Sequence, residues 1–294
     1  MGADTLPSAC SFATVSLPGG AWGEGDQPLR ELRLRPATED DQWFLLDSLD
    51  SGLLPSARAT ALLQRCLEPA QQSIARTLSV GDREALLLQL RSITFGDTMP
   101  CILGCPAQGC AEPMELTLQV SELLTPAYAQ VRKQHELSID DEGASYSLQF
   151  RLPTAADVDA AASLACHDPE LAALELLRSC LAGATHDGRP VSAESLPGAV
   201  RDAVAAAMAE HDPQAEIDLE LDCPNCGQPL SVIFDAAGYL LQELERRAQQ
   251  ALRDVHVLAS EYGWREGEVL QMSAGRRARY IALISETRNR ERAR

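Results

Sequence analysis

The pattern of polar and apolar positions predicts helices over the first third of the chain. From Thr38, in TEDDQWFLLDSLD, acidic residues precede an apolar stretch, which is typical of a helix start. Two more helices are predicted at about residues 55–67 and 82–93. Residues 1–30 are instead rich in Gly, Pro and Ser and contain a Pro-Gly-Gly turn, so we expect a poorly structured N-terminal segment there.

Short alternating runs predict strands on either side of two cysteine-containing turns. TMPCILG and PMELTLQV flank the first turn, and AEIDLELD and SVIFD flank the second. The segments CPAQGCAEPMELTL and CPNCGQPLSVIF both have Pro after their first Cys and a second Pro three residues past their last Cys. We therefore expect two similar hairpin knuckles, at residues 101–118 and 219–235.

The chain between the knuckles is predicted to be mostly helical. A strand is expected at residues 146–152 (YSLQFRL), and Thr154 with Asp157 forms a capping pair ahead of an alanine-rich helix. Further helices are predicted near residues 169–182 and 194–210. Residues 153–212 thus form a helical insertion, and any site built from both knuckles closes a long loop.

The C-terminal part, residues 238–294, is predicted to be a helical extension with breaks near Gly263 and Ser273. Apolar residues recur there at alternating three and four spacing and form one stripe: Leu241, Leu244, Ala248, Ala251, Val255, Leu258 and Tyr262. The stripe packs either inside the chain or against a partner, and the pattern leaves both interpretations open.

Charge restricts the kinds of partner that the chain can bind. Its 294 residues carry a formal net charge of -18, with a sequence pI near 4.6. Residues 255–294 hold 8 Arg against 5 acidic residues, a net charge of +3, which leaves -21 on residues 1–254. Such a charge opposes attraction to the nucleic-acid backbone and to anionic lipid, so we expect neither nucleic acid nor a membrane as partner.

The nine cysteines are expected to be reduced thiols. No run of 18 apolar residues occurs, and the amino terminus lacks the features of a secretory signal, so we expect a cytosolic protein. Because the cytosol keeps thiols reduced, clustered cysteines indicate metal ligands there. Isolated cysteines are instead expected to be small buried side chains: Cys10, Cys66, Cys166 and Cys180.

The clustered cysteines indicate one structural zinc ion. Zinc favours four tetrahedral thiolate or imidazole ligands, and a turn with two cysteines a few residues apart provides two of them. Cys223 and Cys226 have the two-residue spacing and trailing glycine of a zinc-ribbon knuckle. Cys105 and Cys110 have four intervening residues, which is still within the usual range. Cys101, shortly before Cys105, is an alternative ligand.

No catalytic constellation is recognisable, so we expect no enzymatic activity and no small-molecule substrate. A catalytic zinc keeps an open position and uses His or carboxylate ligands, whereas four cysteines leave no position open. A zinc-ribbon nucleic-acid adaptor is an alternative, although the charge of -21 on residues 1–254 disfavours it. A metal-dependent hydrolase is a third hypothesis.

The assembled pattern resembles a known protein family over roughly residues 30–285. The resemblance lies in VGDREALLLQLRSITFGD leading into CPAQGCAEPMELTL, in FRLPTAADVDAA, in CPNCGQPL and in the closing VHVLASEYGWREGEVLQMSAGRRARYIALI. These segments are similar to the baseplate hub assembly proteins of T-even type phages, found in tailed phages and phage-derived contractile injection systems. The resemblance implies a non-catalytic role in baseplate assembly, contacts with other baseplate or tail proteins, and a place in the bacterial cytosol or in the particle.

We therefore predict an α+β fold, with a mainly helical body over residues 31–237, a small zinc-ribbon-like β unit and the helical C-terminal extension. Aromatic and arginine residues are favoured anchors at protein interfaces. Partner-binding residues are accordingly expected in the extension: Trp264, Arg276, Arg277, Arg279 and Tyr280. A solvated basic face is the alternative for these arginines.

Overall fold

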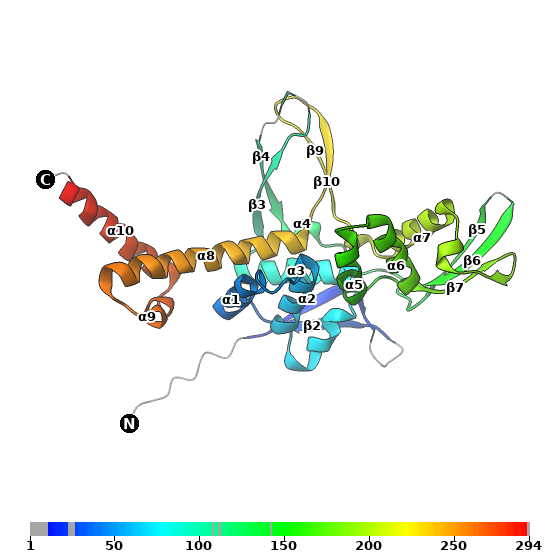
Figure 1. The fold of residues 1–294 in the computed structure, drawn as a ribbon, viewed down its shortest axis with the longest axis horizontal. Coiled ribbons are helices and arrows are strands. Elements are labelled where there is room, and N and C mark those ends of the chain that lie inside the picture. Colours follow the sequence, from blue (N-terminus) through cyan, green and yellow to red (C-terminus); the bar gives the residue numbers. More distant parts are fainter. Residues whose placement is uncertain (1–10, 23–26, 108, 111–112, 142, 293–294) are drawn as a thin grey trace. The chain divides into compact units, whose positions relative to one another are not determined.

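The computed structural model describes residues 11–22, 27–107, 109–110, 113–141 and 143–292 of the chain (Figure 1). Cys10 lies outside the described residues. Unit 1 comprises the described residues of Met1–Ala37 and Leu53–Leu240, and unit 2 those of Thr38–Gly52 and Leu241–Arg294. Helices and antiparallel sheets both occur, which confirms the expected α+β class. Among the described residues, no helix has the length and apolar character needed to cross a membrane.

The core of unit 1 forms around helix α3 (Val80–Phe95), which is buried over most of its length. Strand β1 (Ala13–Ala21) and helix α2 (Pro55–Cys66) pack against it. Several leucines of this core have no exposed surface: Leu62, Leu63, Leu86, Leu87 and Leu90. A helix that buries most of its faces is typical of a protein interior. The two helices expected at about residues 55–67 and 82–93 are thereby confirmed.

Strand β1 overturns the expectation that residues 1–30 hold little regular structure. It pairs antiparallel with β2 (Leu29–Leu34), with an irregular register between Ser16 and Ala21. Gly20 has a φ of 99°, a conformation that glycine adopts without steric cost. The prediction was wrong for this strand because Val15 and Leu17 are buried and because the Gly19 and Gly20 amides donate hydrogen bonds to the distant Asp82 carboxylate, which holds the glycine-rich run in place.

A four-stranded antiparallel sheet forms the second part of unit 1, in the order β5-β6-β7-β8. Its strands are β5 (His135–Asp141), β6 (Ala144–Phe150), β7 (Leu181–His186) and β8 (Arg189–Pro190). Helices α5 (Ala155–Ala165) and α6 (Pro169–Cys180) lie between β6 and β7 in the sequence, and α7 (Gly198–His211) follows β8. Leu148 and Phe150 of the sheet are fully buried with Val200 and Val204 of α7.

The predicted elements of this region are mostly present. The strand expected at residues 146–152 corresponds to β6, and the Thr154 amide donates to the Asp157 carboxylate at 2.8 Å, which confirms the capping pair. The insertion at residues 153–212 is not purely helical, however, because β7 and β8 interrupt it. Leu181 pairs with Phe150 of β6, so a strand begins directly where α6 ends.

Two separate hairpins carry the cysteine turns. Strands β3 (Thr98–Gly104) and β4 (Pro113–Gln119) form one, and β9 (Asp218–Asp222) and β10 (Pro229–Ile233) form the other. The strands expected around both knuckles are confirmed. The short elements of unit 1 are α4 (Val120–Leu123) and the 3-10 helices Pro69–Arg76, Ala193–Ser195 and Pro213–Ala215.

Unit 2 joins an early helix to the end of the chain. Helix α1 (Glu39–Ser48) follows Thr38, the start that the sequence predicts, and the Thr38 amide caps it by donating to the Asp41 carboxylate at 2.8 Å. The long helix α8 (Ala236–Tyr262) begins in unit 1 and is followed in unit 2 by α9 (Glu266–Leu270) and α10 (Ala274–Arg292). The expected breaks near Gly263 and Ser273 are thus present. Most of the apolar stripe is buried within the chain: Leu241, Leu244, Ala248, Ala251 and Leu258.

Candidate metal centre

Four cysteine sulfurs from the two hairpins converge at one place. Cys105, Cys110, Cys223 and Cys226 each offer a Sγ atom, and these atoms all lie within 4.8 Å of one another. Cys105 and Cys223 are buried, Cys110 is half-buried and Cys226 is exposed. No histidine or carboxylate of the described residues belongs to this cluster. The hairpins therefore bring together a set of four thiols that could hold a metal ion.

The sulfur spacing fits a tetrahedral metal. Cys105 Sγ lies 3.7 Å from Cys226 Sγ, and Cys110 Sγ lies 3.8 Å from Cys223 Sγ. A Zn–S bond of about 2.3 Å in tetrahedral geometry places sulfurs about 3.8 Å apart. A disulfide would need a separation of about 2.05 Å, so these cysteines form no disulfide bonds with one another.

The backbone of each turn supports this arrangement. In the second turn, the Gly227 amide donates to the Cys223 carbonyl at 2.8 Å, and Gly227 has a φ of 69°. In the first, Gly109 has a φ of 83° directly before Cys110. Both positions lie in the left-handed region that favours glycine, so each turn has a glycine where the chain reverses. The side-chain amide of Asn225 also donates to Cys110 Sγ at 3.3 Å, which links the two turns.

The other cysteines lie apart from the cluster. Cys101, the alternative ligand, lies within β3, where its thiol approaches the Met99 carbonyl at 3.8 Å. Cys66 and Cys180 are buried, as expected for isolated cysteines. Cys166 is exposed, which corrects that expectation for its side chain, because it follows the last turn of α5 rather than a core position.

A cluster of buried carboxylates near the start of α3 was not anticipated from the sequence. The Asp82 carboxylate accepts hydrogen bonds from the Gly19 and Gly20 amides, each at 2.8 Å. The Asp212 carboxylate accepts from the Gly81 amide at 2.8 Å and from the Tyr128 hydroxyl at 2.9 Å. Burial, together with a smaller contribution from the Asp212 charge, raises the pKa of Asp82 to about 6 against the lowering effect of the two amides. Burial also raises the pKa of Asp212.

The residues predicted to bind a partner gather in unit 2 but differ in exposure. The Trp264 ring lies 4.6 Å from the Tyr262 ring and 5.0 Å from the Tyr280 ring, centroid to centroid. The Arg276 guanidinium lies 5.8 Å from the Tyr280 centroid. Arg276 and Arg279 are exposed, and Trp264 and Tyr280 are half-buried.

Arg277 differs from its neighbours because its side chain lies inside unit 2. Only 4% of its surface is exposed, and its guanidinium lies 3.2 Å from the Asp254 carboxylate and 3.5 Å from that of Glu39. It also donates to the Met272 carbonyl at 2.8 Å. Arg277 thus joins α1, α8 and α10 internally, which leaves Arg276 and Arg279 as the exposed basic side chains of the predicted set.

Fold and site together define an α+β protein with a four-cysteine cluster that could hold a metal ion. Residues 27–238 match the family described as T4 bacteriophage base plate protein, and the chain belongs to this family. It is therefore a structural protein of a phage baseplate, which associates with other baseplate or tail proteins. No curated protein and no solved structure matches the chain significantly.

Proposed function

We propose that the protein is a zinc-stabilised, non-enzymatic assembly protein of the baseplate hub of a contractile tail. The observation that carries this proposal is the convergence of four thiols from two hairpins, in a chain of a phage baseplate family. Zinc in this cluster would join the ends of two hairpins, beside a small apolar cluster to which Leu103, Met114 and Leu230 contribute. The ion would have four sulfur ligands and no vacant position, which supports a structural role rather than a catalytic one.

Elemental analysis of the purified protein tests the identity of the metal. Tetrahedral four-sulfur sites take zinc or iron, so both metals are measured. We expect one zinc per chain, lost in Cys226→Ser and retained in Cys166→Ser, since Cys166 is an exposed thiol outside the cluster. Iron at the same stoichiometry would contradict the zinc assignment, and a metal-free protein that melts at the same temperature would contradict the metal site itself.

The exposed part of unit 2 is proposed to contact another baseplate component. Tyr262 is 41% exposed next to Trp264 and Tyr280, and Arg276 lies over the Tyr280 ring. Partly exposed aromatic rings beside an arginine are typical of the centre of protein interfaces. The basic end of an otherwise acidic chain also favours an acidic surface on that component.

Surface variants test this contact better than truncation, because deletion of residues 255–294 removes the buried Leu258 and Ile284. Arg276→Ala with Arg279→Ala is introduced in cells that express the complete set of tail genes. We expect a folded protein but fewer assembled particles, whereas Arg246→Ala, an exposed arginine of α8, should have no effect. Normal particle yield with the double variant would contradict the proposed contact.

A further inference from the structure

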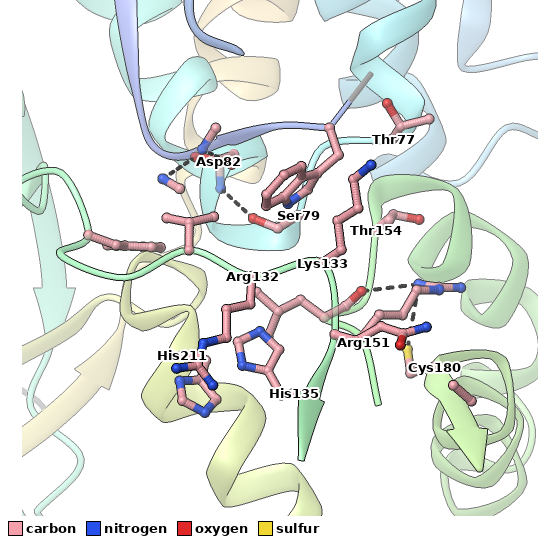
Figure 2. A pocket seen from close by; sticks show the side chains of 18 of the residues that line it. Thr77, Ser79, Asp82, Arg132, Lys133, His135, Arg151, Thr154, Cys180 and His211 are labelled. Atoms are coloured by element: carbon pink, nitrogen blue, oxygen red, sulfur yellow. Dashed lines mark hydrogen bonds between the residues drawn. The ribbon is translucent and has the colours of Figure 1, made fainter. Parts of the chain in front are cut away.

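Unit 1 contains a pocket of about 670 Å³ that the metal centre does not use (Figure 2). This volume is within the range of ligand-binding pockets. Its walls come from β1, from the segment before β5, from the ends of α6 and α7, and from residues 151–154. Trp22, Leu152 and Leu181 provide apolar surface in it. The pocket thus combines apolar walls with polar groups from distant parts of the sequence.

The charges of the pocket are opposite in sign to those of the whole protein. Arg132, Lys133 and Arg151 line it, together with His135 and His211, and Figure 2 shows these side chains around the same space. Among the described residues that line it, Asp82 is the only acidic one, and its carboxylate already accepts two backbone hydrogen bonds. In a chain of net charge -18, this is a concentration of positive charge.

The three basic side chains differ in their partners and in their exposure to solvent. The Arg151 guanidinium bonds both oxygens of Asp157, at 2.6 and 2.9 Å, so its charge is largely balanced within the protein. Arg132 and Lys133 are exposed at the pocket, and the Lys133 ammonium lies 5.2 Å from the centroid of the Trp22 ring. Arg132 and Lys133 therefore place positive charge at the solvent-accessible surface of the pocket.

A buried imidazole in the wall of the pocket also lacks, among the described residues, a hydrogen-bond partner for one of its nitrogens. His135 is 5% exposed and stacks on His211 at 4.1 Å, yet its Nε2 atom has no hydrogen-bond partner in the described part of the chain. Buried polar atoms are nearly always hydrogen-bonded, so such an atom requires an explanation. Burial first, and then the nearby His211 and Arg132, lower the pKa of His135 to about 4. The His135 imidazole is therefore uncharged near neutral pH, and the positive charge of the pocket comes from Arg132, Lys133 and Arg151.

We propose that this pocket binds an acidic peptide segment of another baseplate protein, an inference that rests on the proposed assembly function for the existence of such a partner. Arg132 and Lys133 would pair with its carboxylates, and Trp22, Leu152 and Leu181 would cover its apolar atoms. A single phosphate or carboxylate ion fills only a small part of 670 Å³ and has nothing to place against the apolar walls. The acidic surface elsewhere repels such a segment, so binding concentrates at this pocket.

Binding of short labelled peptides to the purified full-length protein tests the proposal. The probe is a fluorescein-labelled peptide of alternating glutamate and leucine, and the matched probe replaces every glutamate by glutamine. We expect the glutamate peptide to bind more tightly by about tenfold or more, and increasingly weakly as salt is added, because charge pairing provides the difference. Inorganic phosphate at the peptide's concentration should not displace it.

Protein variants locate the binding. Arg132→Ser with Lys133→Ser should weaken binding of the glutamate peptide about tenfold. Arg189→Ser with Arg246→Ser removes the same charge from two exposed positions outside the pocket and should leave the affinity unchanged. The unlabelled peptide should also change the intrinsic tryptophan fluorescence, and Trp22→Phe should abolish that change. Each variant is first shown to melt like the wild type.

Three outcomes would overturn the proposal. The first is equal binding of the glutamate and glutamine peptides, and the second is equal loss of affinity in the pocket variant and the control variant. The third is complete displacement by inorganic phosphate, which would make the pocket a small-anion site. None of these measurements uses metal content or particle yield, so failure here leaves the proposed assembly function to be judged by its own tests.

Discussion

Unit 1 contains two clusters, the four thiols and the buried carboxylates of Asp82 and Asp212. Each joins segments that are far apart in the sequence, but by different chemistry. The Cys105 and Cys226 sulfurs meet 121 residues apart in the sequence, and the Gly81 amide and Asp212 carboxylate meet 131 residues apart. The thiols lie at hairpin ends, where Cys226 is exposed, whereas Asp82 and Asp212 are buried. The first cluster would gain strength from an added ion, and the second gains it from hydrogen bonds in a low-dielectric interior.

This difference predicts which change of conditions destabilises each cluster. Without an ion, four thiols remain at the ends of two hairpins, each a separate two-stranded sheet, and among the described residues only a small apolar cluster with Met114 and Leu230 packs beside them. Two-stranded hairpins with little packing are marginally stable. Removing a carboxylate from the second cluster leaves buried donors without partners inside an intact core. The thiol cluster should therefore respond strongly to chelators, and the carboxylate cluster to pH.

The largest effect is expected from Cys226→Ser. Structural zinc contributes about 10–16 kcal/mol in zinc-finger peptides, comparable to the whole stability of a domain at about 5–15 kcal/mol. We expect the variant to lose the metal and its hairpins to lose protection from amide hydrogen exchange, with aggregation on heating. Cys166→Ser, the matched control, should keep the metal and the wild-type melting temperature. Full metal content in Cys226→Ser would remove this cysteine from the ligand set.

Asp212→Ala should have the next largest effect. It leaves the buried Gly81 amide and the Tyr128 hydroxyl without their acceptor, which costs about 1–3 kcal/mol for such groups. Urea denaturation measures this loss of unfolding free energy, and metal content should remain unchanged. Asp202→Ala, an exposed aspartate of α7, should change stability by less than about 0.5 kcal/mol. If both variants were equally stable, the carboxylate cluster would have no role in holding the segments together.

The sequence predicts one cluster and not the other for a physical reason. Paired cysteines with Pro and Gly at matching positions are rare in a reduced chain, so the sequence alone assigns Cys105, Cys110, Cys223 and Cys226 to one group. Aspartates near helix starts are common, and the local pattern around Asp82 indicates only the start of a helix. Its long-range hydrogen bonds to Gly19 and Gly20 depend on tertiary contacts that local patterns do not contain.

The same distinction separates the predicted helices from the missed strands. Helices α2 and α3 follow from local apolar patterns and start signals, which tertiary packing reinforces. Strands β1 and β7 pair or pack with segments far away, β7 with β6 across two helices, so their sequences alone give weak signals. The pocket residues were also not predicted from the sequence. Lys133, the single lysine of the chain, was the one signal in the sequence that could have indicated them.

A smaller effect is expected from pH, through Asp82. Its pKa is raised from 3.8 to about 6, so between these values the folded protein holds a proton that the unfolded chain has released. Stability from this group is therefore highest at low pH and falls as pH rises, by about 1 kcal/mol between pH 5 and 7. Asp82→Asn should remove this component from the pH dependence of urea unfolding. A variant with the same slope as wild type would show that Asp82 does not titrate in this range.

The smallest effect is expected from Cys101→Ser, which tests the boundary of the thiol cluster. Cys101 pairs with Leu116 within the β3–β4 ladder, four residues before Cys105, and at about 3.3 Å per residue the two lie about 13 Å apart along the chain. A metal with bonds of about 2.3 Å cannot use both. The serine hydroxyl can still donate to the Met99 carbonyl, so the unfolding free energy should change by less than about 0.5 kcal/mol, with one metal ion retained per chain. If Cys101→Ser lost the metal while Cys105→Ser retained it, Cys101 rather than Cys105 would be the ligand, and the four-thiol cluster described above would be wrong.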